Sequence, residues 1–171
     1  MVGLHEFDLT NLYDTFVETM QYAKSDLGFA NSRSRLRMVT LYQLAATTNG
    51  LVVGTGNKVE DFGVGFYTKY GDGGVDISPI ADLMKTEVYT MARELGINQE
   101  ILEAQPTDGL WGDNRNDEDQ IGATYPELEW AMEYEGDGSD LNNRQQLVLD
   151  IYLNFHNKNK HKMNPIPVFK K

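Results

Sequence analysis

Residues 51–57, Leu51-Val52-Val53-Gly54-Thr55-Gly56-Asn57, decide the fold class. The first three form a short, continuous apolar run, which is typical of a strand buried on both faces of a parallel sheet. A helical pattern precedes this run over residues 30–47, where apolar side chains recur at a spacing of three and four. A helix, a buried strand and a glycine turn predict an α/β protein. Ligands of open parallel sheets bind beyond the carboxyl ends of the strands, where residues 54–57 lie.

Other helix signals flank this segment. Ser78 and Pro79 resemble the cap and first-turn residue of a helix that would run to Leu95, where Gly96 follows. A further helix is expected over residues 142–156. Two later prolines predict that residues 157–171 form an extended basic tail. A length of 171 residues fits a single domain, residues 1–171.

Composition excludes several classes of function. The formal net charge of −11 disfavours a nucleic-acid partner, because binding to the phosphate backbone depends on clustered lysine and arginine. The chain has no cysteine, so disulfides and thiol catalysis are excluded. Neither an apolar run of membrane-spanning length nor a secretory signal is present. We therefore expect no membrane partner and a cytoplasmic location.

The charge is unevenly distributed along the chain. Residues 154–171 carry five lysines, two histidines and no acids. Such a tail could contact a phosphate group, or it could lie against an acidic surface of its own or a partner chain. Composition leaves both interpretations open.

The chain contains three candidate segments for chemistry. On the first helix Arg33 and Arg37 are neighbours at a spacing of four, while Arg35 points the other way; all three could be structural or could snorkel to water. The turn at residues 54–57 lets a ligand approach the backbone, with Glu60 nearby as a possible Mg²⁺ ligand, or it is a plain strand-to-helix turn. Residues 66–76 combine glycine, aromatic and charged side chains, as binding loops and solvated loops both do.

Taken together these segments resemble the ammonia-dependent NAD synthetases. The matching stretches occur in the same order and with fitting spacing, and the string GFYTKYGDGG is long enough to be specific. They are residues 31–38, 54–60, 65–74, 79–85, 106–111, 117–118 and 160–163. The resemblance implies a Rossmann-like parallel sheet of the adenine-nucleotide alpha-hydrolase type, flanked by helices. It also implies the amidation of nicotinic acid adenine dinucleotide (deamido-NAD) to NAD, with ATP, Mg²⁺ and free ammonia and through an adenylated intermediate.

The family's site residues carry over motif by motif. Contacts to ATP are implied for Thr55, Lys85 and Thr107, and Glu60 is similar to the family's Mg²⁺ ligand. Asp72 resembles an acid near the nicotinate end, where ammonia arrives, and is the candidate catalytic residue. Contacts to deamido-NAD are implied for Arg35, Lys69, Asp76, His161 and Lys162. The resemblance also implies a homodimer.

The chain departs from the family in one respect. It contains no Ser-Gly-Gly-x-Asp-Ser string, the loop that holds the pyrophosphate of ATP in the family. We therefore expect a C-terminal part of a synthetase domain, with the first strands of the sheet missing and no turnover by the chain alone. The chain could be a fragment, a truncated gene product or one half of a split enzyme whose N-terminal half is a separate chain. The alternative is a non-catalytic remnant that folds or dimerises. A related ATP pyrophosphatase acting on another acid is disfavoured by residues 69–76.

Overall fold

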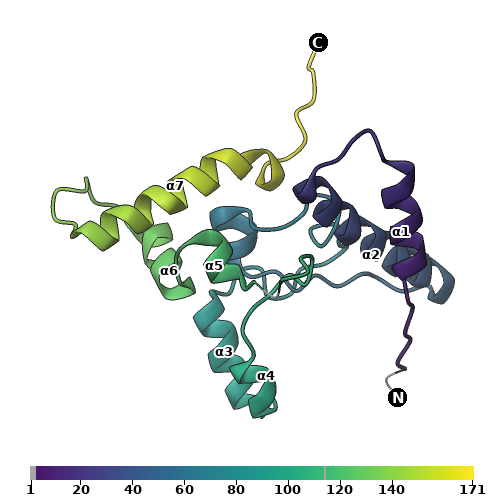
Figure 1. Ribbon diagram of the computed structural model, residues 1–171. Coiled ribbons are helices and arrows are strands. Elements are labelled where there is room, and N and C mark those ends of the chain that lie inside the picture. The colour runs from purple at the N-terminus through teal and green to yellow at the C-terminus, as the bar shows by residue number, and fades with distance from the viewer. Residues whose placement is uncertain (1–2, 114) are drawn as a thin grey trace.

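The computed structural model describes residues 3–113 and 115–171, and its regular structure is helical (Figure 1). Helices α1 and α2 lie on one side of the molecule and α5, α6 and α7 on the other, while long connecting segments cross between them (Figure 1). The bounds are α1 Thr10–Thr19, α2 Asp26–Thr48, η1 Val59–Val64, α3 Lys85–Glu94, α4 Gln99–Glu103, α5 Asp117–Ile121, α6 Tyr125–Glu133 and α7 Asn143–Met163. None of the helices in the described residues is long and apolar enough to span a membrane.

Helix α2 begins earlier than its apolar pattern predicts. Ser25 caps it, because the Ser25 hydroxyl accepts a hydrogen bond from the Gly28 amide at 3.2 Å. The helix ends as predicted: Asn49 adopts a left-handed conformation with φ 54°. Because of the early start, Asn31 and Arg35 lie beyond the first turn of the helix.

The predicted strand at residues 51–53 makes a single parallel bridge, between Val53 and Ile77. The Gly54 amide donates to the Ile77 carbonyl at 2.7 Å, and the Asp76 amide donates to the Val52 carbonyl at 2.9 Å. Val52 is buried, as expected of a central strand, whereas Val53 is exposed. Within the described residues the parallel sheet is thus limited to this bridge, and a full sheet stays a prediction.

The helix predicted from Ser78 to Leu95 is wrong at its start. Residues 78–83 form successive turns, and α3 begins only at Lys85. The Leu83 carbonyl is occupied by the Lys58 amide at 2.8 Å, so these turns are tied to the segment after the glycine turn. The Glu87 carboxylate then accepts from the Met84 amide at 2.8 Å and caps the real helix. The consequence is that Lys85 lies at the helix N-terminus, facing the rest of the protein.

The prediction of an extended tail over residues 157–171 is wrong in its first half. Helix α7 continues to Met163, and only residues 164–171 lack regular structure. Tertiary contacts hold the last turns: the buried Asn159 amide donates to the Val64 carbonyl at 2.8 Å, and Lys162 also binds backbone carbonyls. Both prolines lie beyond Asn164, so they prevent further helix only after that residue and not from residue 157. His161 and Lys162 are therefore carried on a helix.

The core is small and lies where η1, α6 and α7 meet. Val59 and Val64 of η1, Leu128 of α6 and Val148 of α7 are almost completely buried. Full burial of an aliphatic side chain is worth about 1.5–3 kcal/mol, so Val59 and Val64 hold η1 firmly in the core. Glu60 follows Val59 directly, and its position is therefore fixed by this core.

Candidate functional site

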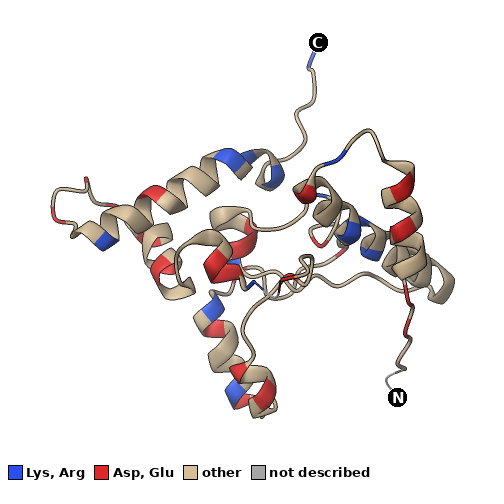
Figure 2. Ribbon diagram, viewed as in Figure 1, with Lys and Arg blue, Asp and Glu red and all other residues tan. Residues whose placement is uncertain are grey.

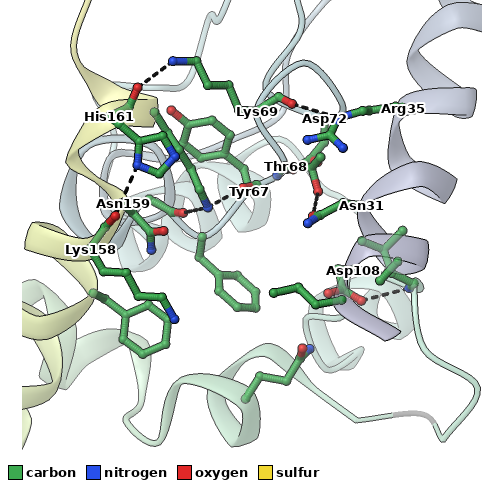
Figure 3. Close-up of a pocket in the computed structure, with 18 of the residues that line it drawn as sticks. Asn31, Arg35, Tyr67, Thr68, Lys69, Asp72, Asp108, Lys158, Asn159 and His161 are labelled. Atoms are coloured by element: carbon green, nitrogen blue, oxygen red, sulfur yellow. Dashed lines mark hydrogen bonds between the residues drawn. The ribbon is translucent and has the colours of Figure 1, made fainter. Parts of the chain in front are cut away.

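Two adjoining cavities occupy the middle of the molecule. The turn cavity, of about 450 Å³, lies around Gly54, Thr55 and Gly56 and extends to η1 and α3. The interhelical cavity, of about 330 Å³, lies between α2 and α7 (Figure 3). They share five lining residues: Phe66, Tyr67, Asp72, Asp108 and Lys162. A ligand in one cavity can therefore reach a ligand in the other.

The turn cavity brings together the four residues expected to bind ATP and Mg²⁺. Thr55, Glu60, Lys85 and Thr107 all line it. The Lys85 ammonium lies 3.2 Å from Glu60 Oε1, and both side chains are mostly buried. The Thr107 hydroxyl donates to the Arg115 carbonyl at 3.2 Å and accepts from the Gly109 amide at 3.2 Å. The cavity therefore offers hydroxyl groups that suit a base, an ammonium that suits a phosphate and a carboxylate that suits a cation.

The local backbone explains how Glu60 reaches this cavity. Residues Val59–Val64 form a π-helical turn, a rare conformation that is frequent at functional sites. Asn57 caps the turn, since its side-chain oxygen accepts from the Val59 and Glu60 amides. The Asp61 carboxylate lies against Gly56 so closely that a Cβ there would be 2.3 Å from Asp61 Oδ1. Glycine at position 56 thus lets the acidic segment pack onto the turn.

The interhelical cavity brings together most residues expected to bind the dinucleotide. Figure 3 shows Arg35 on α2 opposite His161 on α7, with Lys69 on the loop between them. Arg35 Nε donates to the Lys69 carbonyl at 3.2 Å, and the Lys69 ammonium donates to the His161 carbonyl at 2.6 Å. These two hydrogen bonds connect α2, the loop and α7, so they hold the positively charged side chains of the cavity in place relative to one another. Lys and Arg are also concentrated at the end of α7 (Figure 2).

Lys162 lies at the junction of the two cavities. Its ammonium donates to the carbonyls of Gly65 and Tyr67, each at 2.8 Å. It also lies 5.4 Å from the centre of the Tyr67 ring. Burial lowers the pKa of Lys162. An ammonium has three donors, so two secure the loop backbone and one remains for a ligand.

Asp72 also borders both cavities and is held by two bonds to one oxygen. Its Oδ1 accepts from the Ser34 hydroxyl at 2.7 Å and from the Thr68 amide at 3.0 Å. The Asp72 amide in turn donates to the Ser34 hydroxyl at 3.0 Å. The carboxylate is thereby oriented without engaging Oδ2 in a hydrogen bond within the described residues. Oδ2 is the oxygen that could act on a ligand.

Asp76 is the one expected site residue that lines neither cavity. Its carboxylate accepts from the Val52 amide at 2.8 Å and from the Tyr42 hydroxyl at 3.2 Å. It therefore fastens the strand at Val52 to α2. Arg33 and Arg37 are also structural: Arg33 donates to the Leu110 carbonyl, and Arg37 donates to the carbonyls of residues 108 and 109.

Sequence reasoning missed two acids of the turn cavity and a tyrosine that contacts Glu60. Asp117 is buried, and its Oδ1 has no hydrogen-bond partner in the described part of the chain. Burial, followed by the charge of Glu60, raises the pKa values of Asp61 and Asp117 to about 6. The Tyr125 hydroxyl donates to Glu60 Oε1 at 2.5 Å and lies 3.4 Å from Asp117 Oδ2. Three consecutive acids at residues 117–119 are typical of a solvated surface. The helix cap at Asn116 was the available signal of an ordered segment.

The donor set of the turn cavity fits Mg²⁺ as one part of a shared site. Carboxylate oxygens are the ligands that Mg²⁺ prefers, and an orphaned carboxylate oxygen on Asp117 is consistent with a missing partner. Among the described residues, however, no three acidic or histidine side chains converge as a metal cage. Because Mg²⁺ commonly takes only one or two protein carboxylates and completes its shell with phosphate and water, Glu60 would bind it together with a polyphosphate.

Asp117 gives a pH-dependent prediction. Its raised pKa means that the folded chain binds the proton more tightly than the unfolded chain, so stability falls as pH rises from about 4 to about 6. Glu60 and Asp108 oppose its ionisation, while Lys85 favours it. Asp117→Asn removes this penalty and should raise the unfolding free energy at pH 7.5 by ~1 kcal/mol. Solvent screening reduces the ~3 kcal/mol that a shift of about two pKa units would otherwise give.

Denaturant unfolding between pH 4 and pH 8 measures this effect. Wild type and variant should approach each other toward pH 4, where the wild-type carboxyl is protonated in the folded state and nearly half protonated in the unfolded state. Asp119→Asn on the same helix is the control, because Asp119 is exposed and should show no such pH dependence. A stabilisation by Asp117→Asn that is equal at all pH values would contradict the explanation.

The features of the two cavities indicate a class of protein. Acids and a lysine surround a glycine turn, and an adjoining cavity is lined by cations and aromatic rings. Such surroundings suit phosphorylated nucleotides, because lysine and arginine pair with phosphate and aromatic rings stack on bases. The site is that of a nucleotide-binding protein.

The family follows from the comparisons with known proteins. A profile of the NAD synthase family matches residues 2–165, and the chain belongs to this family. An NH(3)-dependent NAD(+) synthetase from Thermoplasma volcanium is 39% identical over 155 residues, which cover 91% of this chain and 62% of that protein. A second from Alkaliphilus oremlandii is 44% identical over 130 residues, covering 76% of this chain and 48% of that protein.

The fold is shared with a solved structure. The NMN synthetase from Francisella tularensis superposes with a TM-score of 0.85 and 30% identity, covering 98% of this chain and 66% of that one. The chain spans about half to just under two thirds of the length of the two curated relatives.

Proposed function

We propose that this chain provides the adenylation and amidation site of an ammonia-dependent NAD synthetase, which converts deamido-NAD to NAD at the expense of ATP. The observation that supports this proposal is the junction of the two cavities at Asp72 and Lys162. Amidation of a carboxylate by way of an acyl adenylate requires two nucleotides to meet at their reacting ends, and two adjoining anion-binding cavities provide for this. We also propose a cytoplasmic location.

In this proposal ATP occupies the turn cavity. Thr55 and Thr107 offer hydroxyls to the nucleotide, and Lys85 offers a cation to its phosphates. Glu60 would hold Mg²⁺ against the polyphosphate, where the ion would supply positive charge to the phosphate oxygens. Phosphate binding would require Lys85 to divide its three donors between Glu60 and the ligand.

Deamido-NAD occupies the interhelical cavity. Arg35, Lys69, His161 and Lys162 supply cations or donors around a space that also contains Tyr67. Asp76 lies outside this cavity, so its proposed contact with the dinucleotide requires an extended ligand that runs along α2. A homodimer with the ligand close to its interface, which we also propose, would cover such a ligand.

The chemistry takes place at the junction. A nicotinate carboxylate oxygen attacks the α-phosphorus of ATP, and pyrophosphate leaves. Ammonia then attacks the carboxyl carbon of the acyl adenylate, its surplus proton is removed, and AMP leaves with the bonding electrons. Asp72 Oδ2 is placed to attract ammonium and to accept that proton, while Ser34 and Thr68 hold the carboxylate by Oδ1. Lys162 stabilises negative charge on the phosphate during the first step.

Isothermal titration calorimetry of the 171-residue chain tests the proposal. We expect ATP with Mg²⁺ and deamido-NAD each to bind with one site per chain, and Arg35→Ala to weaken deamido-NAD about tenfold without affecting ATP. Arg93→Ala is the matched control, because Arg93 is exposed on α3. Nicotinic acid mononucleotide is the comparison ligand, because the Francisella protein is named for NMN synthesis.

Each outcome of this titration supports or contradicts one part of the proposal. Tighter binding of the mononucleotide than of deamido-NAD would shift the proposal to an NMN-forming enzyme. No binding of either at millimolar concentration would favour the alternative, a non-catalytic remnant that folds or dimerises. A coupled assay of NAD formation by the chain with ammonia should show no turnover. Clear turnover would contradict our expectation that a phosphate-binding loop must be supplied elsewhere.

A further inference from the structure

The two oxygens of the Glu60 carboxylate have different surroundings. Oε1 receives the Lys85 ammonium at 3.2 Å and the Tyr125 hydroxyl at 2.5 Å. Oε2 receives the Asn57 amide at 3.3 Å. A carboxylate oxygen accepts about two hydrogen bonds, so within the described residues Oε1 is saturated and Oε2 retains capacity.

Tyr125 is well suited to hold Glu60 in place. It is the first residue of α6 and is 3% exposed, and its ring belongs to the core formed with η1 and α7. Its backbone amide donates to Glu118 Oε1 at 2.8 Å, so the start of the helix is itself fixed. The hydroxyl is thus a donor on a rigid support, unlike the flexible Lys85 side chain.

We infer that Tyr125 is a positioning residue for Glu60, and that its hydroxyl occupies Oε1 so that Oε2 is the oxygen left for a divalent cation. This inference rests on the proposed function, because it assumes that the turn cavity binds ATP with a metal ion. Lys85 is the weaker support for Glu60 during ATP binding, because its ammonium must divide its donors between Glu60 and the phosphates. When Lys85 turns toward phosphate, Tyr125 keeps Glu60 in its orientation.

The nearest alternative is a purely structural tyrosine. A buried tyrosine needs a partner for its hydroxyl, and Glu60 satisfies that need whether or not a metal ion binds. The two explanations differ in what the loss of the hydroxyl changes. A structural role affects stability alone, whereas a positioning role affects binding of the metal-nucleotide complex more than binding of the free nucleotide.

The test compares Tyr125→Phe with Tyr134→Phe in the full chain. Tyr134 is the matched control, because its hydroxyl also donates to a carboxylate at 2.9 Å, but that acid, Asp140, does not line the turn cavity as Glu60 does. The probes are ATP with Mn²⁺ and ATP with a chelator, measured by water-proton relaxation and calorimetry. Tyr125→Phe should weaken Mn²⁺-ATP about fivefold and change free ATP less than twofold, the effect expected for one hydrogen bond. Tyr134→Phe should change neither.

A double-mutant cycle adds a second, independent readout. Because Tyr125 acts through Glu60, Tyr125→Phe in a Glu60→Gln background should cost no further affinity for Mn²⁺-ATP. Wild-type affinity in a folded Tyr125→Phe variant, or additive losses in the cycle, would overturn the inference while the proposed function stands. If the wild-type chain bound ATP equally with and without Mn²⁺, the proposed metal site would fail and the inference with it.

Discussion

Replacing Glu60 by glutamine is expected to weaken binding of Mg²⁺-ATP at least tenfold and to abolish its advantage over free ATP. The carboxylate is the proposed protein ligand of the ion, and an amide removes its charge while keeping its size. Lys85 would also lose its anionic partner at 3.2 Å, so free ATP should bind no worse and could bind better. Calorimetry with and without Mg²⁺ measures both affinities.

The control is Glu133→Gln on α6, an exposed acid outside both cavities. It changes the net charge by the same amount, so it corrects for long-range electrostatics in an acidic chain. Equal losses for Mg²⁺-ATP and free ATP in Glu60→Gln would contradict a metal-binding role. They would indicate that Glu60 only orients Lys85.

Much of the candidate site could be predicted from the sequence. Thr55 and Glu60 closely follow the apolar residues 51–53, and Gly54 and Gly56 on either side of Thr55 are typical of a turn after a strand. Lys69 and Asp72 lie in a glycine-rich string whose resemblance to one family is specific. Local patterns of this kind keep their meaning because Thr55 and Glu60, and likewise Lys69 and Asp72, are also near neighbours along the chain.

Distant residues that reach the site by tertiary packing, such as Lys85 and Lys162, were predicted only through the family resemblance. Tyr125 and Asp117 contact Glu60 or its surroundings because α5 and α6 pack on η1, and the Asn116 cap signals a helix start but not that contact. The end of α7 was predicted wrongly for the same reason, since Asn159 and Lys162 extend the helix through contacts with residues 64–67. The predicted start of α3 at Ser78 was wrong because the backbone hydrogen bond from Lys58 to the Leu83 carbonyl outweighs a good local cap at Ser78.

The sheet could be inferred only in outline. The apolar residues 51–53 predict a strand, but pairing needs partners, and one parallel bridge to Ile77 is what the described residues provide. Val53 and Ile77 remain exposed, as does Leu51. Apolar residues exposed beside an unpaired strand are consistent with the chain spanning only part of its relatives' length.

Replacing Lys162 by methionine is expected to have the widest effect of any single change. The two carbonyls that it binds, those of Gly65 and Tyr67, would lose a charged donor, and the unfolding free energy should fall by about 2–3 kcal/mol. Because Lys162 lines both cavities, affinity for ATP and for deamido-NAD should fall together, each by tenfold or more. Denaturant unfolding and calorimetry on the same samples measure these effects.

Two control variants on the same helix separate the roles of Lys162. Lys160→Met should change neither stability nor binding, because Lys160 is exposed and lines neither cavity. Lys158→Met should weaken deamido-NAD alone, because Lys158 lines only the interhelical cavity of the two (Figure 3). A Lys162→Met variant that loses stability but binds both nucleotides normally below its unfolding transition would show that the lysine only fastens the loop. Loss of both affinities in a folded variant would identify Lys162 as the residue through which the two cavities act as one site.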